Sequence, residues 1–166
     1  ETLKETQEFV EARLVQIADQ VAREDWRTPQ DRFDELVDIY DKQPLFSART
    51  STSMDDQAYS TPAPMAFVLR HMTGVTPQTS VYDATAGNGM LGIGSDLKNS
   101  VANEINERRR FGLAQLGVGT ITSQDATSPV GVFKNRPKVQ VVHLNPPFGG
   151  IPNVNFDGYG IRKLEH

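Results

Sequence analysis

The chain has 166 residues, of which 37% are hydrophobic and 23% are charged, a balance that suits one globular domain with an appendage. No apolar run approaches the roughly 20 residues that a membrane span needs, and no secretory signal opens the chain, so we expect no membrane association and a cytoplasmic location. Cysteine is absent, which excludes disulfide scaffolds, thiolate metal sites and cysteine nucleophiles. With a formal net charge of −4, the chain has no general attraction for a polyanion, so any nucleic acid would have to be held mainly by other segments.

The two ends of the sequence suggest a piece of a longer protein. The chain begins at Glu1 rather than at a methionine. It ends in Leu164-Glu165-His166, which suits either a natural sequence or the start of a vector-encoded histidine tag. We therefore interpret the chain as an excised fragment.

Two helices and a linker are predicted in the first third of the chain. Apolar residues recur at three- and four-residue steps from Leu3 to about Arg23, which predicts an amphipathic helix. Thr28-Pro29 starts a second helix that Pro44 ends, and residues 47–53 are rich in Ser and Thr without apolar periodicity. We expect a helical region over residues 1–48, a linker over 49–56 and a second unit over 57–166.

The second unit alternates strands and helices. Thr61-Pro62 is expected to cap a helix that ends at Gly74. Strands are then predicted at 80–83, 101–104, 120–124 and 139–144, with helices near 90–97 and 106–116. This order predicts an α/β fold with a parallel sheet. The last strand is almost continuously apolar, which is typical of a central strand covered on both faces.

Candidate ligand-binding residues follow three of these strands. The run Asp83–Gly92 has the spacing G-x-G-x-x-G, which lets backbone approach a ligand closely but also occurs in turns without one, and which fits NAD as well. Glu104, about 17 positions after Gly87, could accept hydrogen bonds from ribose hydroxyls or could lead the next helix. Asp125 could accept from an adenine amine or could form a turn.

The most specific element is Asn145-Pro146-Pro147-Phe148, which directly follows the fourth strand. Two consecutive prolines cannot belong to a sheet, but they can fix the Asn145 side-chain oxygen and the Pro146 carbonyl in one direction. Two such acceptors suit one exocyclic NH₂ group, and Phe148 offers a face to its ring. Accepting both hydrogens favours a pyramidal nitrogen whose lone pair can attack a methyl group without a covalent enzyme intermediate.

In this order, these motifs resemble those of the amino-methyltransferases that use S-adenosyl-L-methionine: the N6-adenine DNA methyltransferases and their RNA and protein-glutamine relatives. The resemblance covers about residues 57–148 and implies a partial Rossmann-like class I methyltransferase fold, with about four parallel strands and an N-terminal helical extension. Ala84-Thr85 departs from the commoner proline-containing loop. The implied catalytic residues are Asn145, Pro146, Pro147 and Phe148. The implied cofactor-binding residues are Tyr59, Thr61, Pro62, Asp83, Ala84, Gly87, Gly89, Glu104, Asp125 and Asn145.

The resemblance implies methyl transfer to an exocyclic amine, with N6 of adenine in DNA as the first expectation. The alternatives are methyl transfer to RNA, methyl transfer to a protein glutamine, and a catalytically silent scaffold domain of a larger helicase-containing protein. An NAD-dependent oxidoreductase would leave residues 145–148 unexplained. We expect DNA rather than RNA as the partner, bound mostly outside this chain, and self-association or contact with a helicase domain of the parent protein.

Three smaller features are given structural interpretations. The basic run 108–110 is expected to be a solvated helix face, because successive helix positions point in different directions. His71 and His143 lack partners at ligand spacing, so we assign them no catalytic role and expect no metal site. Trp26, Phe33 and Tyr40 stand near seven-residue spacing, which predicts a packed helix seam.

Overall fold

The computed structural model describes residues 3–43, 60–126 and 138–145. In chain order its elements are α1 (Leu3–Ala22), α2 (Pro29–Asp41), α4 (Ala63–Met72), β1 (Val81–Asp83), the 3₁₀ turns η1 (Met90–Gly92) and η2 (Leu97–Asn99), β2 (Val101–Asn103), α5 (Glu107–Leu116), β3 (Thr120–Thr122) and β4 (Val141–His143). The strands form one sheet in the order β3-β2-β1-β4, and every pairing is parallel. The predicted α/β fold with four parallel strands is confirmed.

Local sequence signals explain where the helices begin and end. The Thr28 hydroxyl accepts a hydrogen bond from the backbone N–H of Asp31, which caps α2 as its Thr-Pro sequence predicts. Asn106 caps α5 in the same way, by accepting from two backbone N–H groups of the first turn. Gly117 ends α5 with a φ of +93°, a left-handed conformation that glycine adopts at little cost.

The helix predicted near 90–97 is absent, and this prediction was wrong. The segment forms only η1 and η2. Gly89 and Gly94 have φ values of +91° and +70°, which an α-helix does not allow, so the chain turns twice instead of continuing a helix. The Asp96 N–H donates to the Thr79 carbonyl and holds the second turn against the strand side of the molecule.

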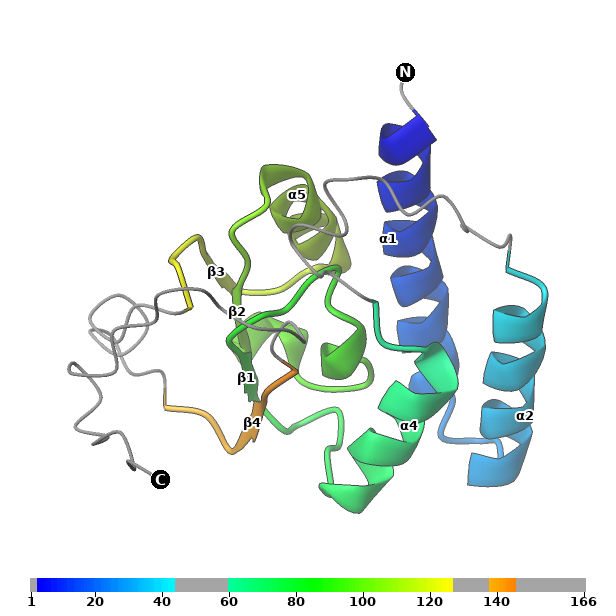
Figure 1. Ribbon diagram of the computed structural model, residues 1–166. Helices are drawn as coiled ribbons and strands as arrows, with labels where there is room; N and C mark the ends of the chain where they lie inside the picture. The colour runs from blue at the N-terminus through cyan, green and yellow to red at the C-terminus, as the bar shows by residue number, and fades with distance from the viewer. Residues whose placement is uncertain (1–2, 44–59, 127–137, 146–166) are drawn as a thin grey trace, which may run out of the picture.

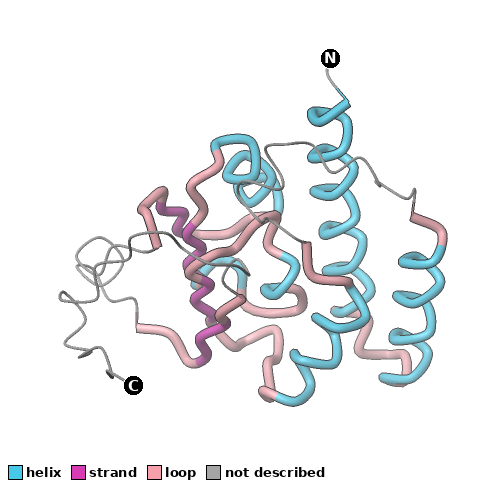
Figure 2. Tube along the Cα trace, in the orientation of Figure 1, coloured by secondary structure: helices cyan, strands magenta, loops and turns pink. Residues whose placement is uncertain are grey.

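The N-terminal helices and the sheet unit share one hydrophobic core. Val15 of α1 and Leu36 of α2 are buried in the same cluster as Phe67 of α4 and Ile93 beyond η1. The predicted division at the linker 49–56 therefore does not separate two cores, and the linker itself lies outside the described residues. In Figures 1 and 2, the helices α1, α2 and α4 stand together on one side of the sheet, with α5 beside α1.

β4 differs from the prediction of a central strand covered on both faces. Among the described strands it forms an edge of the sheet, beside β1. Val142 is 54% exposed, because the described helices lie to the other side of the sheet (Figure 1). None of the helices in the described part of the chain combines the length and the apolar character that crossing a membrane requires.

Candidate functional site

The parallel sheet brings the ends of its strands to one edge. Asp83 at the end of β1 pairs in register with Ala102 of β2 on one side and with His143 of β4 on the other. Residues that follow β2 and β4 therefore reach the same edge as the loop that follows β1. Glu104 and Asn145 lie at this edge, where ligands of open α/β sheets bind.

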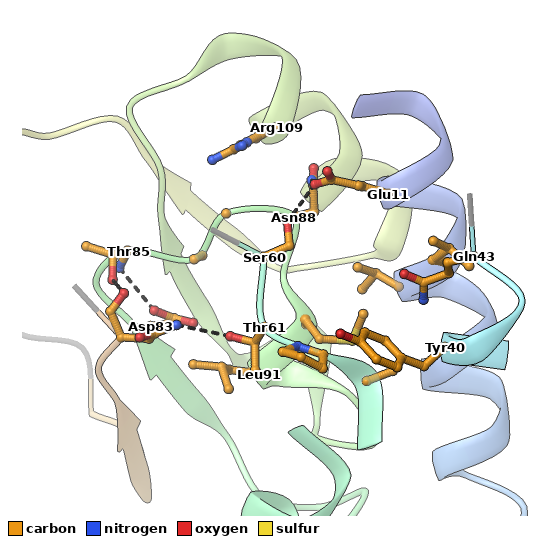
Figure 3. Close-up of a pocket in the computed structure, with 18 residues that line it drawn as sticks. Glu11, Tyr40, Gln43, Ser60, Thr61, Asp83, Thr85, Asn88, Leu91 and Arg109 are labelled. Carbon is orange, nitrogen blue, oxygen red and sulfur yellow. Dashed lines mark hydrogen bonds between the residues drawn. The ribbon is translucent and has the colours of Figure 1, made fainter. Parts of the chain in front are cut away.

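A cavity of about 90 Å³ lies where this edge meets the helical hairpin (Figure 3). Its lining combines residues from α1, α2 and α5 with the segment before α4, the loop after β1 and Asn145 beyond β4. The predicted site residues that line it are Thr61, Pro62, Asp83, Gly87 and Asn145. Small-molecule pockets usually measure at least about 300 Å³, so this cavity has room for one part of a small molecule rather than for a whole one.

Asp83 places a buried carboxylate at the floor of the cavity. Only 5% of the residue is exposed, and Oδ1 accepts a hydrogen bond of 3.0 Å from the Thr85 N–H. Oδ2 is buried and has no hydrogen-bond partner among the described residues. Burial raises the pKa of this carboxyl to about 6, the Thr85 hydrogen bond lowers it, and the negative charge of Glu104 raises it further. A ligand with an N–H or O–H donor would satisfy Oδ2.

Asn145 is held in the cavity from two sides. Its Nδ2 donates to the Thr61 hydroxyl at 3.0 Å, and its backbone carbonyl accepts from the Thr85 hydroxyl at 3.1 Å. Figure 3 shows the Thr61 contact beside Asp83. With Nδ2 directed at Thr61, the opposite atom of the amide, Oδ1, serves as a hydrogen-bond acceptor.

The glycine loop is shaped by its neighbours. An added Cβ at Gly89 would lie 2.8 Å from the end of the Leu113 side chain and 3.0 Å from the end of Leu116, so both leucines would have to shift, and the φ of +91° itself favours glycine. At Gly87, by contrast, φ is +56° and no atom lies within 4 Å of the added Cβ. Gly87 therefore faces open space at the cavity wall, where a ligand can approach the backbone. Ala84 is buried, and its carbonyl accepts from the Asn103 side chain.

Glu104 and Asp125 lie outside the cavity lining. Glu104 is buried, and its two carboxylate oxygens accept from the backbone N–H groups of Gly87 at 2.8 Å and Asn106 at 2.7 Å. It therefore fixes the glycine loop against the start of α5. Asp125 follows β3 and is exposed. The predicted ribose and adenine contacts of these two acids stay predictions.

Several predicted site residues lie outside the described part of the chain. Tyr59 precedes it, and Pro146, Pro147 and Phe148 follow Asn145, the last described residue. The roles predicted for these four residues stay predictions.

Sequence reasoning missed the contribution of α1. Glu11 lines the cavity and accepts from the Ser60 hydroxyl at 2.6 Å and from Asn88 Nδ2 at 3.1 Å. One turn earlier, Glu8 pairs with Arg109 of α5, with Nη2 and Oε1 3.0 Å apart. The prediction of a solvated face was therefore wrong for Arg109, whose side chain is 14% exposed and lines the cavity.

The predicted aromatic seam is also only partly correct. Phe33 packs against the core, but Trp26 is 80% exposed and Tyr40 is 45% exposed. Tyr40 lines the cavity instead (Figure 3). Seven-residue spacing brings side chains to one helix face, but the spacing alone does not determine which face is covered.

Asn103 is a second residue that the motifs did not indicate. It is buried at the end of β2, where its Nδ2 donates to the carbonyls of Ala84 and Gln124 and its Oδ1 accepts from the Thr122 hydroxyl and the Gln124 N–H. One side chain thus ties the ends of β2 and β3 to the loop after β1. A polar residue in an otherwise apolar strand was the signal that could have identified it.

The two histidines contact backbone carbonyls. Nδ1 of His143 lies 2.9 Å from the Leu91 carbonyl, and Nδ1 of His71 lies 2.9 Å from the Phe67 carbonyl. Burial lowers the pKa of His143, although its bond to Leu91 opposes the shift. Within the described ranges, no three His, Asp or Glu side chains gather where they could hold a metal ion.

Comparisons with known proteins give a structural likeness. No family model matches the chain, and no curated protein matches it. A crystal structure from Pyrococcus horikoshii, of a protein provisionally assigned as an RNA methyltransferase, superposes with a TM-score of 0.50 and 24% sequence identity. The match covers 72% of this chain and 61% of that one, so the chain spans about three fifths of the neighbour's length. Together with the parallel sheet order, this likeness shows that the chain has a Rossmann-like α/β fold of the kind found in class I methyltransferases.

Proposed function

We propose that this chain binds S-adenosyl-L-methionine and takes part in methyl transfer to an exocyclic amine. The observation that carries the proposal is the position of Asn145. Its side chain, anchored through Nδ2 by Thr61, lines the same cavity as Asp83 and Gly87. The residues expected to hold the cofactor and the residue expected to orient the amine are thus next to one another.

The cavity residues fit the cofactor. Asp83 offers a buried oxygen without a partner in the described structure, which suits a donor group of the ligand. Gly87 leaves open space where a side chain would stand, so a ligand can approach the backbone closely. When bound, the cofactor supplies an electrophilic methyl group on its sulfonium sulfur. Thr61, Asp83 and Gly87 would hold it at this edge of the sheet, and Glu104 would support the loop from behind.

Asn145 acts on the methyl acceptor. An exocyclic amine conjugated to a ring is a poor nucleophile, because its lone pair is delocalised into the ring. Oδ1 of Asn145 would accept one amine hydrogen and the carbonyl of Pro146, a predicted contact, would accept the other, which would localise the lone pair on nitrogen. The methyl group would then pass from the sulfonium sulfur to this nitrogen as the S–C bond breaks, S-adenosylhomocysteine would leave, and the amine would release one proton to solvent. This chemistry depends on positioning and directed hydrogen bonds. It needs no cysteine nucleophile.

We propose N6 of adenine in DNA as the acceptor, on the basis of the resemblance of residues 145–148 to the adenine methyltransferase tetrapeptide. Adenine in RNA is the second candidate, because the structural neighbour from P. horikoshii carries an RNA methyltransferase designation. In duplex DNA the base would have to be flipped out of the stack to reach Asn145. Because the chain has a net charge of −4, segments outside it would supply most of the phosphate contacts.

Ligand-induced stabilisation tests the cofactor. Thermal unfolding is measured with S-adenosylmethionine, S-adenosylhomocysteine and NAD in parallel. A ligand at 100 times its dissociation constant should stabilise the fold by roughly 2.7 kcal/mol. Stabilisation by the two S-adenosyl compounds alone supports the proposal, whereas stabilisation by NAD alone would favour the oxidoreductase alternative and overturn it.

Methyl transfer tests the reaction. The protein is incubated with cofactor carrying a labelled methyl group and with either adenine-containing DNA or RNA. We expect label on adenine N6, and its loss in Asn145→Ala at saturating cofactor. Cofactor binding without transfer to either nucleic acid or to protein glutamine would instead identify a catalytically silent domain.

A further inference from the structure

Arg70 of α4 is a buried cation without a counter-ion. Only 6% of the residue is exposed, and its guanidinium has no hydrogen-bond or ion-pair partner among the described residues. Nε is fully buried, whereas Nη1 and Nη2 keep some contact with solvent, so a ligand can reach them. A buried charge without a partner is strongly destabilising, which makes such an arginine unusual in a folded protein.

Two other arginines lie near Arg70, and each of them already has a carboxylate. Nε of Arg23 lies 2.7 Å from Oδ2 of Asp19, and Nη1 of Arg32 lies 3.1 Å from Oδ1 of Asp25. The cluster therefore contains three guanidiniums and two carboxylates. The charge of Arg70 is the one that the described structure leaves unbalanced.

The packing of the helices holds the three arginines together. Arg70 packs against Gly94 so closely that a Cβ at this glycine would overlap the Arg70 side chain. The carbonyl of the next residue accepts a hydrogen bond of 2.6 Å from Nη2 of Arg23. Arg32 lies over the ring of Phe67, one turn before Arg70 on α4, with its Cζ 5.5 Å from the ring centroid. In Figure 1, the last turn of α4 and the connection between α1 and α2 both lie at the lower end of the helices.

The surroundings of Arg70 carry an excess of positive charge. Burial lowers the pKa of Arg70, and the charges of Arg32 and Arg23 lower it further, while Asp25 and Asp19 oppose the shift. The site thus disfavours the charged guanidinium in the absence of a ligand. A bound anion would reverse this effect, because an opposite charge at close range favours the charged form.

We propose that Arg70, flanked by Arg23 and Arg32, forms a binding site for a phosphate group. A tetrahedral oxyanion can accept hydrogen bonds from several guanidiniums at once, and arginine suits this geometry. The side chains of Arg23 and Asp25 are 34% and 64% exposed, so an anion can enter beside them. The phosphate group can belong to free phosphate or to a nucleic-acid backbone, which present the same chemistry to the arginines.

This site is separate from the cavity at the carboxyl edge of the sheet. Glu11 lines that cavity, and Arg23 follows the last residue of α1. A helix rises about 1.5 Å per residue, so about 18 Å separates the two positions along α1. The inference therefore stands independently of the proposed methyl transfer.

The test is a titration of the protein with inorganic phosphate at constant ionic strength, followed by phosphorus NMR. We expect saturable binding by the wild type. Arg70→Met keeps an unbranched side chain against Gly94 and removes the charge. Charge-assisted hydrogen bonds contribute about 1.5–3 kcal/mol, so this variant should bind phosphate roughly 10- to 100-fold more weakly. Arg13→Gln removes the same charge from an exposed position of α1 and should keep the wild-type affinity.

Asp25→Asn should act in the opposite direction. It removes the carboxylate that pairs with Arg32 and competes with an incoming anion. Exposed ion pairs contribute about 0.2–1 kcal/mol, so phosphate should bind up to about fivefold more tightly. Because the Asp25 side chain is 64% exposed, we expect the variant to fold. It therefore decides the question if Arg70→Met does not fold.

Three results would overturn the proposal. They are the absence of saturable phosphate binding by the wild type, equal affinity in the wild type and Arg70→Met, and weaker binding by Asp25→Asn than by the wild type. A single-stranded oligonucleotide then distinguishes the sources of the phosphate group. Displacement of bound phosphate by the oligonucleotide, lost in Arg70→Met, would identify the nucleic-acid backbone, whereas retention of phosphate would identify a site for free phosphate.

Discussion

Ionisation of Asp83 should leave a clear signature in the stability of the ligand-free protein. Its buried carboxyl has a pKa of about 6, against an ordinary value of 3.8. The unfolded chain therefore loses this proton near pH 4, whereas the folded protein keeps it to about pH 6. The folded state binds more protons than the unfolded state in this range. The contribution of Asp83 to stability is therefore complete below about pH 4 and declines as the pH rises through about 6.

The size of the effect follows from the two pKa values. The gap between 3.8 and about 6 is close to two pH units, and at about 1.36 kcal/mol per unit it corresponds to about 3 kcal/mol lost by pH 7. About half of that loss, roughly 1 to 2 kcal/mol, falls between about pH 5 and pH 7.5. Asp83→Asn removes the ionisation and keeps an oxygen for the Thr85 N–H. If the new side-chain N–H of the Asp83→Asn variant lacks an acceptor, the folded state loses about 1–3 kcal/mol of stability, but this loss does not change with pH.

Urea denaturation of the wild type and of Asp83→Asn at several pH values between 5 and 7.5 measures the effect. We expect the difference between their free energies of unfolding to shift by roughly 1 to 2 kcal/mol in favour of the variant as the pH rises. Other titrating groups are common to both proteins and cancel in the difference. Parallel pH profiles would refute the reasoning, because they would show that Asp83 is ionised in the folded state as readily as in the unfolded one.

Two further predictions concern Asn145 and the turns after β1. Thr61→Val removes the acceptor of the Asn145 amide and should lower kcat of methyl transfer, measured at saturating cofactor, roughly tenfold, the effect of about 1.4 kcal/mol. Thr61→Ser should restore kcat, and an unchanged kcat in the valine variant would contradict the positioning role. Gly94→Ala should cost at least about 2 kcal/mol in chemical denaturation, because the residue has a φ of +70° and its Cβ would lie 2.3 Å from Nε of the buried Arg70. Gly117→Ala, at a φ of +93° with open space around it, should cost only about 1 kcal/mol, and equal losses at the two sites would exclude the Arg70 contact as the cause.

The sequence was sufficient to predict most of the elements, because their signals are local. The Thr28 cap and the alternation of apolar strands with helical patterns each depend on neighbours within a few positions. The helix predicted near 90–97 failed because apolar spacing carries no information on backbone conformation, and Gly89 and Gly94 adopt positive φ values there. Gly89 was interpreted only as a ligand-approach position, and Gly94 was given no interpretation.

The missed parts of the site depend on contacts that are distant in sequence. Glu8 and Arg109 are 101 positions apart, and nothing in either local sequence distinguishes a buried ion pair from two solvated charges. Asn103 likewise has its role only once β3 and the loop after β1 surround it. Trp26 shows the converse error, since regular spacing favoured burial and the residue is 80% exposed.

The short connection between β1 and β2 explains why the N-terminal helices belong to the site. Parallel strands are usually joined by a crossover helix that covers the sheet and packs behind the glycine loop. Here the connection contains only η1 and η2. α1 packs against α5 and η1 instead, and it brings Glu11 to Asn88 of the loop. The wall of the cavity that a crossover helix would form is therefore supplied from the start of the chain. Removing α1 should expose the core around Leu91 and Ile93 and open the cavity together, so the hairpin is a structural part of the proposed cofactor site rather than an appendage to it.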